Sequence, residues 1–252
     1  MEFFIFTFLR DLVIKLIRKG FVAPINFGGK KMEETNNQNN NNKSTERLVL
    51  SAIFIALASV LSMLQPFALP QGGGITILSM LPIIILAYRY GLLWGLGSSF
   101  IYSVIQMLLG FGTVSAFFLP GDDQQLWWKA ILICLMDYVI AYTCMCLGGL
   151  FRKSNNASVS LTLGSIIALS CRYLVHILSG AIFFGSWAEW WFTDVMSGDF
   201  GTSVLETYSG FGLALFYSVI YNGLYMIPEI ILTAIGAFIV GKFSTIVGKP
   251  SI

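Results

Sequence analysis

The sequence predicts an all-α integral membrane protein, a six-transmembrane-helix bundle with its N and C termini in the cytoplasm. Three observations lead to this prediction. Of the 252 residues, 56% are hydrophobic and only 11% are charged, whereas soluble domains carry about 25% charged residues. The hydrophobic residues form long blocks, and a block of about 20 residues can cross a bilayer. Basic residues gather on one side of these blocks. The composition excludes a soluble enzyme, a disordered chain and a nucleic-acid-binding protein.

The N-terminal residues 1–46 are different in kind, and we predict a partly disordered extension. Residues 33–46 read EETNNQNNNNKSTE, a polar, Asn-rich tract that cannot bury a core. The sequence Gly-Gly-Lys-Lys stands directly before Met32, and a translated purine-rich ribosome-binding site would encode such a sequence. We therefore hypothesise that residues 1–31 are a mis-annotated start. The membrane domain is expected at 47–243, followed by a cytoplasmic tail at 244–252.

From residue 47 onward, six hydrophobic blocks are each roughly long enough to cross a bilayer. Helices are expected because lipid offers no hydrogen-bond partners to free backbone groups. The second block is short, and Pro82 within it predicts a kink or a tilt. The expected spans are 47–64, 75–90, 92–110, 126–150, 160–184 and 211–241.

The charges between these spans predict their orientation. Basic residues precede the first span, lie between the second and third and between the fourth and fifth, and follow the sixth; thirteen of the fifteen Lys and Arg residues are on this side. The other connections, 65–74, 111–125 and 185–210, carry acidic residues and only Lys129 near their edge. The positive-inside rule therefore places both termini in the cytoplasm and these three connections outside.

The first span carries two small residues one turn apart, Ala52 and Ala56. Such spacing lets two helices approach closely in lipid. Packing within the chain and docking to a partner subunit are both compatible with it.

Apart from basic residues near the span ends, four residues with charged or imidazole side chains lie within the expected spans: Asp137, Arg172, His176 and Glu229. A charged residue at a helix centre costs about 2.5–3.5 kcal/mol on insertion scales, so such residues usually face a cavity or a partner. Arg172 precedes His176, the only histidine, by four residues, which places both on one helix face. Either these side chains line a ligand path, or Asp137 and Arg172 form an ion pair that only fixes helix packing. Glu229 lies deeper and is set apart from the others.

Aromatic and amide side chains extend this group. Tyr138 follows the aspartate, and Tyr217, Tyr221 and Tyr225 recur every four residues with Asn222 among them. A cavity lined by a carboxylate, aromatic faces, an amide and an imidazole suits a flat, cationic, hydrogen-bonding heterocycle. Aromatic faces attract a cation, and the carboxylate accepts hydrogen bonds from an amino group.

The outward connection 185–210 contains three tryptophans close together, Trp187, Trp190 and Trp191. An aromatic belt at the membrane interface is one interpretation. An ordered cover over a binding cavity is the other.

Motifs for catalysis are not found. The chain has no H-E-x-x-H sequence, and the P-loop-like stretch ending in Phe243 lacks the required Ser or Thr. We expect no catalytic residues, no bound metal ion, no cofactor and no ATPase in this chain. The alternative from another class is an intramembrane enzyme that uses Asp137 and His176 as an acid–base pair.

Several motifs, taken in order and spacing, resemble a known family across roughly residues 47–243. The chain is similar to the thiamine-specific S components of energy-coupling factor (ECF) transporters. The motifs are Leu69-Pro-Gln-Gly-Gly-Gly-Ile-Thr76 with Met80-Leu-Pro-Ile83, Leu135-Met-Asp-Tyr138, Arg172-Tyr-Leu-Val-His176 with Ser179-Gly180, Phe183-Phe-Gly-Ser186, and Tyr217-Ser-Val-Ile-Tyr-Asn-Gly223.

The resemblance implies a bacterial plasma-membrane protein with six helices and an outward-facing, tight site for thiamine. It also implies uptake driven by a separate module, with one ECF transmembrane coupling subunit and two cytosolic ATP-binding subunits as partners. Within the same class, the alternative is an S component for another vitamin or for the thiamine precursor hydroxymethylpyrimidine.

The resemblance also assigns roles to individual residues. Asp137 would contact the aminopyrimidine, and Gly180 would let the ligand approach its helix. Ala52 and Ala56 match the motif that meets the coupling subunit. The rings would be held by Tyr138, Phe184, Trp187, Trp190 and Tyr217, and the polar contacts would come from Arg172, His176 and Asn222. Some members have Glu in place of Asp137 and Trp in place of Phe184.

Overall fold

The computed structural model describes residues 33–69, 72–121, 123–243, 247–248 and 250. It divides into two units, Met1–Thr45 and Glu46–Ile252, and the site discussed below lies within the second. The hypothesised start at Met32 and most of the expected tail at 244–252 fall outside the described residues. The placement of both termini in the cytoplasm stays a prediction.

Five stretches of the described chain are long and apolar enough to cross a membrane. They coincide closely with five of the six expected spans, because a hydrophobic block of bilayer length is the strongest signal such a sequence carries. The helices that contain them are α2 (Glu33–Ser62), α4 (Leu92–Leu109), a composite stretch Trp127–Gly149, α8 (Ala157–Phe183) and α11 (Gly210–Gly241).

The expected second span is the exception. Residues 67–75 form a two-stranded antiparallel hairpin, β1 (Phe67–Ala68) with β2 (Gly74–Ile75), and only α3 (Leu81–Tyr90) is helical. Ten residues make about 15 Å of helix, half of a bilayer core. Pro82 lies in the first turn of α3, where a proline starts a helix and does not kink it. The six-helix count is therefore not confirmed, and the expected kink is wrong.

The short helix α3 is enclosed by protein. Its residues from Leu81 to Tyr88 are all buried, and it packs against α4 and the end of the composite stretch. Together with α8 these elements form the largest hydrophobic core. Non-helical backbone inside a membrane is tolerated where protein surrounds it. The turn between β2 and α3 meets this condition, because Thr76 and Ser79 are buried and Thr76 is hydrogen-bonded to Glu229 of α11.

The composite stretch changes its helix type three times. It runs through α6 (Trp127–Ile133), the π-helical turn η1 (Cys134–Ile140), α7 (Ala141–Thr143) and the 3₁₀ turn η2 (Cys144–Gly149). A π turn widens the helix locally, and such turns occur frequently at functional sites. Here the π turn contains Asp137 and Tyr138.

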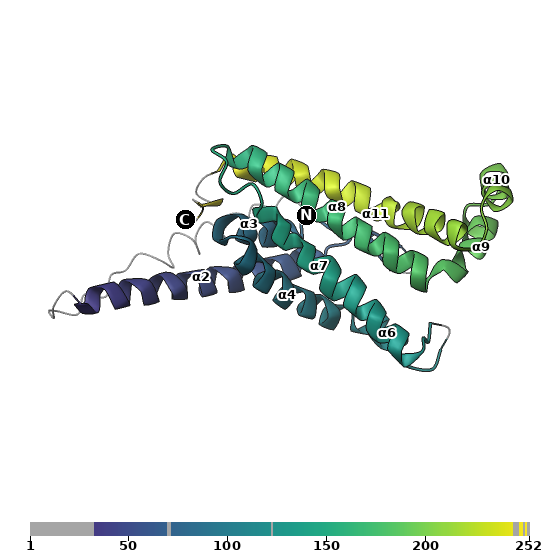
Figure 1. Ribbon diagram of the computed structural model, residues 1–252, viewed down its shortest axis with the longest axis horizontal. Coiled ribbons are helices and arrows are strands. Elements are labelled where there is room, and N and C mark those ends of the chain that lie inside the picture. Colours follow the sequence, from purple (N-terminus) through teal and green to yellow (C-terminus); the bar gives the residue numbers. More distant parts are fainter. Residues whose placement is uncertain (1–32, 70–71, 122, 244–246, 249, 251–252) are drawn as a thin grey trace. The chain divides into compact units, whose positions relative to one another are not determined.

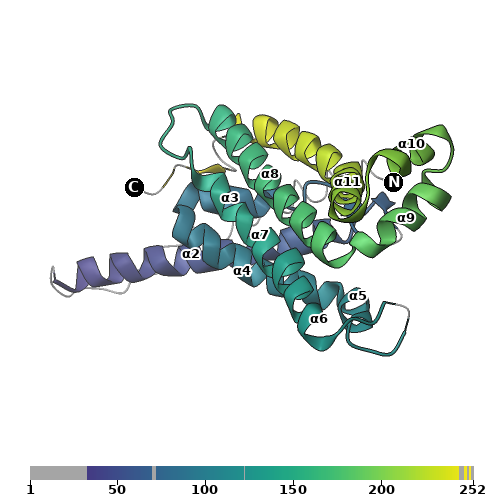
Figure 2. The same ribbon diagram turned by 45° about the vertical axis from the view of Figure 1, so that its right-hand side comes forward.

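Helices α8 and α11 lie side by side along much of their length. Both views show this pair, with α8 in green and α11 in yellow-green (Figures 1 and 2). Glycines permit close approach on both sides of α8. A Cβ on Gly241 of α11 would collide with the backbone of Ser158 in α8, and a Cβ on Gly164 would collide with the backbone of Gly148 in η2. Close backbone approach through small residues is the usual basis of helix association in membranes.

The remaining helices are short and lie in the connections. They are α5 (Phe111–Ala116), η3 (Gly185–Trp187), α9 (Ala188–Trp190), η4 (Trp191–Val195) and α10 (Asp199–Thr207). The expected outward connection 185–210 is therefore mostly helical. A second hydrophobic cluster around Trp191 and Phe192 joins it to the first turns of α11.

The Asn-rich tract is drawn into the first helix, while the expectation of a partly disordered extension over residues 1–46 stays a prediction. Helix α2 begins at Glu33 and includes the tract. Propagating an existing helix needs only one hydrogen bond per added residue, so the apolar part of α2 can extend into a sequence of low intrinsic propensity.

Candidate functional site

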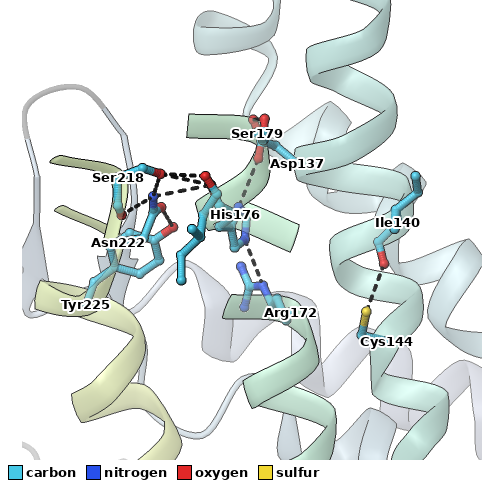
Figure 3. A network of polar contacts seen from close by, with 10 residues as sticks. Asp137, Ile140, Cys144, Arg172, His176, Ser179, Ser218, Asn222 and Tyr225 are labelled. Atoms are coloured by element: carbon cyan, nitrogen blue, oxygen red, sulfur yellow. Dashed lines mark hydrogen bonds and ion pairs between the residues drawn. The ribbon is translucent and has the colours of Figure 1, made fainter. Parts of the chain in front are cut away.

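Asp137 is the centre of a polar network between η1 and α8. Its Oδ1 lies 3.0 Å from His176 Nδ1, and its Oδ2 accepts a 2.8 Å hydrogen bond from Ser179 Oγ. The π turn places Asp137 on the side of the helix that faces α8, and Figure 3 shows its carboxylate between the two partners. These two partners hold the aspartate side chain, and 21% of its surface remains exposed.

The hydrogen bonds of His176 determine which ring nitrogen carries the proton. Arg172 Nε donates to His176 Nε2 over 3.2 Å. A guanidinium can only donate, so Nε2 must be an acceptor and the proton must reside on Nδ1. Nδ1 then donates to Asp137. The imidazole is neutral in this arrangement, and neither nitrogen is free to accept a further proton.

Arg172 is buried and belongs to the same network from the other side of the imidazole. Besides His176, its Nη1 donates to Met80 Sδ, and its guanidinium lies 4.3 Å from the centre of the Tyr142 ring. In the described part of the chain it forms no ion pair with Asp137; His176 stands between them. The simple ion pair that the sequence left open is therefore not what the structure contains.

Asn222 joins the network from α11 but has little capacity left for a ligand. Its Nδ2 donates to the carbonyl of His176 and to Ser218, and its Oδ1 accepts a 2.7 Å hydrogen bond from Tyr225 Oη. Tyr225 in turn meets the His176 ring edge-on, with the ring centres 6.1 Å apart. The amide thus fixes α11 to α8 (Figure 3), and its expected ligand contact stays a prediction.

Gly180 faces α11. A Cβ at this position would lie 3.1 Å from Asn222 Nδ2 and would collide with Ser218 Oγ. The structure thus gives Gly180 a role in helix packing, and its expected closeness to a ligand stays a prediction.

The Gly180→Ala variant tests this packing role. We expect it to lower the melting temperature measurably, because overpacking a tight contact costs about 1–3 kcal/mol. Gly97→Ala on α4 is the matched control, since a Cβ at Gly97 would meet no atom within 4 Å. Equal melting temperatures of the two variants in detergent would show that α8 and α11 do not depend on this contact.

Aromatic side chains gather next to the network, at the start of α11. Trp191 is 3% exposed, and its ring centre lies 5.5 Å from Tyr217 and 6.4 Å from Tyr221. Phe184 and Trp187 pack against this cluster. Trp190 is 43% exposed and touches only the rim, through an edge contact with Trp187. The buried cluster thus contains Trp191, whereas the resemblance implied a ligand contact for Trp190, which stays a prediction.

The two tyrosines of the composite stretch differ in position. Tyr138 stacks on Tyr142 and points toward Gly110 at the end of α4. The ring beneath the Arg172 guanidinium is that of Tyr142, which sequence reasoning missed. The ring-binding role of Tyr138 stays a prediction.

This arrangement favours binding over proton-transfer chemistry. A carboxylate offers about four acceptor positions, and Asp137 uses two of them within the protein. It can therefore accept hydrogen bonds from a ligand, whereas the imidazole has no free nitrogen for a substrate proton. Among the described residues, no group of three or more His, Cys, Asp or Glu side chains is placed to hold a metal ion.

Ala52 and Ala56 lie outside this site on α2, and both are exposed. Ala58, by contrast, is fully buried in the main core. Within the described unit, the small residues one turn apart are therefore not used for packing inside the chain. Their face of α2 is open to lipid or to another protein.

Comparisons with known proteins agree with this architecture. The sequence model described as thiamine transporter protein (Thia_YuaJ) matches residues 48–195. The thiamine transporter ThiT of Bacillus subtilis (strain 168) is 29% identical over 205 residues, which cover 77% of this chain and 88% of the relative. The solved structure of ThiT from Listeria monocytogenes aligns with a TM-score of 0.58 at 23% identity, over 81% of this chain and 98% of that chain. The last similarity shows a common fold.

Proposed function

Since the chain belongs to the thiamine transporter protein family (Thia_YuaJ), we propose that it is the thiamine-binding S component of an ECF-type vitamin uptake transporter. The family and the apolar helices make it a multi-pass protein of the bacterial cell membrane. The proposal goes further in naming thiamine as its ligand and a separate ATPase module as its source of energy.

The observation that carries the proposal is the fixed, partly accessible carboxylate of Asp137. Its two internal partners hold it in one orientation, and its unused acceptor positions suit the amino group of an aminopyrimidine. Thiamine carries such a ring. A preorganised acceptor costs the ligand little to engage, because the side chain is already ordered.

The balance of charge supports a cationic ligand. The Asp137 carboxylate is partly exposed, and its direct partner, the His176 imidazole, is neutral. The negative charge of Asp137 is therefore not neutralised by the groups that it contacts. A single positive charge, such as that of the thiazolium ring, would neutralise it, and the faces of Tyr217 and Trp191 can attract the same cation.

The proposed transport cycle depends on other subunits. Thiamine would bind from outside, beside the connection 185–210, and the exposed Ala52–Ala56 face of α2 would dock on the transmembrane coupling subunit. Two cytosolic ATP-binding subunits would then drive reorientation of the bundle. Both termini would lie in the cytoplasm by the positive-inside rule.

Fluorescence titration of the purified protein tests the ligand. We expect thiamine to quench the emission of the tryptophans near the site, above all Trp191, with saturation at one equivalent. Hydroxymethylpyrimidine should bind more weakly, because it lacks the thiazolium cation. Riboflavin is the negative control. Tighter binding of the pyrimidine would assign the chain to the precursor, and chemical conversion of thiamine in detergent would favour the enzyme alternative.

A further inference from the structure

Glu229 is a buried carboxylate that the proposed binding site does not use. It lies in α11 and is fully buried. Its Oε2 accepts a 2.7 Å hydrogen bond from the backbone N–H of Thr76, and its Oε1 accepts a 2.6 Å bond from Thr76 Oγ1. Because that hydroxyl donates to the carboxylate, it accepts from Ser79 Oγ, 2.6 Å away. A buried charge is tolerated only with such partners, so this contact is specific.

The residues that Glu229 holds form a strained turn between β2 and α3. Leu78 has a positive φ of 58°, a conformation that is rare for a residue with a bulky side chain. Such strain persists only when the surroundings fix it. Thr76 and Ser79 are fixed through Glu229, and the Leu78 side chain occupies the space above Gly236, where a Cβ would lie 2.6 Å from its Cδ2. The turn is therefore attached to α11 at two places.

This turn leads directly into the polar network. Met80 follows Ser79 at the start of α3, and its Sδ accepts a hydrogen bond from Arg172. Arg172 donates to His176, which donates to Asp137.

The preceding residues of the same segment contact the tyrosine face of α11. The carbonyl of Gly72 accepts a 2.9 Å hydrogen bond from Tyr221 Oη. Gly73 lies flat against Tyr225, where a Cβ would come within 2.6 Å of the ring. The described residues 72–80 thus touch site side chains at both ends, and Glu229 holds their middle.

We propose that Glu229 is a positioning residue for the ligand site: by anchoring the Thr76–Met80 turn to α11, it sets Met80 against Arg172 and so orients the Arg172–His176–Asp137 chain. Glu229 itself does not touch the ligand. The proposal rests on the proposed function for its binding readout, but the anchoring contact can be tested without any ligand.

The binding test compares four variants of the full chain in detergent. Glu229→Leu removes both acceptors and should weaken thiamine affinity at least about tenfold, mainly through faster dissociation. Glu229→Gln keeps the shape and one acceptor, so its affinity should stay within about threefold of wild type. Thr76→Val removes only the hydroxyl and should lie between them. Thr233→Val is the matched control, because its buried hydroxyl has no hydrogen-bond partner among the described residues, and its affinity should be unchanged.

A double variant separates positioning from a general loss of stability. In an Arg172→Met background, Glu229→Leu should cost at most about a further twofold in affinity, because both changes interrupt one chain of contacts. If the two substitutions instead reduce thiamine affinity by factors that multiply in the double variant, the proposal is overturned. Wild-type affinity in Glu229→Leu or Thr76→Val would also overturn it, whatever happens to the melting temperature.

Hydrogen–deuterium exchange of the ligand-free protein provides a readout that does not depend on thiamine. Amides in the peptide 72–80 should exchange faster in Glu229→Leu than in wild type, and they should keep wild-type protection in Thr233→Val. If wild-type protein binds no thiamine while this difference is present, the proposed function fails and the anchor stands. If the peptide is equally protected in all variants, the anchor is refuted.

Discussion

Asp137→Asn is expected to weaken thiamine binding by about 150-fold. The asparagine keeps the shape and can still accept from the His176 N–H, but it removes the negative charge and half of the acceptor capacity. Losing one partner of a buried, hydrogen-bonded charge pair costs roughly 2–5 kcal/mol, and ~3 kcal/mol corresponds to that factor in the dissociation constant. Fluorescence titration of the purified variant measures it directly.

The control for this variant is Asp199→Asn, an equal loss of charge in the first turn of α10. Its dissociation constant should match that of wild type. The melting temperature of Asp137→Asn should also be close to wild type, since the side chain keeps its internal partners. Wild-type affinity in Asp137→Asn would remove Asp137 from the binding site and with it the main support for a cationic aminopyrimidine ligand.

Replacing Ala52 and Ala56 together by tryptophan should abolish most uptake and leave binding intact. Both residues are exposed on α2, and neither belongs to the hydrogen-bonded network around Asp137. If this face docks on the coupling subunit, two large side chains prevent the close helix approach, and overpacking of ~1–3 kcal/mol per site reduces association at least tenfold. Uptake of labelled thiamine by cells measures the first effect, and titration of the purified variant measures the second.

Gly97→Trp on α4 serves as the comparison for this pair, because it also adds a large side chain to an exposed position with open space around it. It should transport thiamine at the wild-type rate. Normal uptake by the double alanine variant would mean that α2 meets only lipid here. Loss of both binding and uptake would point to misfolding instead.

Much of the helical framework could be predicted from hydrophobic blocks alone. The block at 92–110 ends within a residue of α4, and the block at 211–241 matches α11 equally well. Within the block at 75–90, only Leu81–Tyr90 is helical, because the residues before it belong to a hairpin and a turn that hydropathy does not reveal. All residues of this helix from Leu81 to Tyr88 are buried in protein.

Only part of the candidate site could be predicted, because helical spacing identifies one face of a helix and not the helix that packs against it. Helical spacing placed Arg172 and His176 on one face, and the structure connects them by a hydrogen bond. Spacing along one helix does not reveal which other helix it meets. Only the packing of α8 against α11 shows that the Asn222 amide is hydrogen-bonded to α8 and that Gly180 faces Ser218.

Two residues to which the sequence analysis gave no role carried a usable signal. Ser179 lies three residues after His176, so it shares a helix face with a residue already identified. Tyr142 follows Tyr138 by one turn in the same way. The sequence cannot distinguish the burial of Trp191 from that of Trp190, because the two residues are identical and adjacent. Only tertiary packing shows that Trp191 is buried and Trp190 is exposed.

The π turn at Cys134–Ile140 makes this stretch sensitive to its length. A π turn holds one residue more than an α-helical turn, because its hydrogen bonds join residues five apart and not four. Deleting one residue would therefore let this stretch close into regular α-helical turns and change the direction of the side chains inside it. Asp137 would leave His176 and Ser179 even though every side chain of the network was still encoded. At positions of the turn other than Asp137, a change of amino acid should therefore cost less ligand affinity than the loss or gain of one residue.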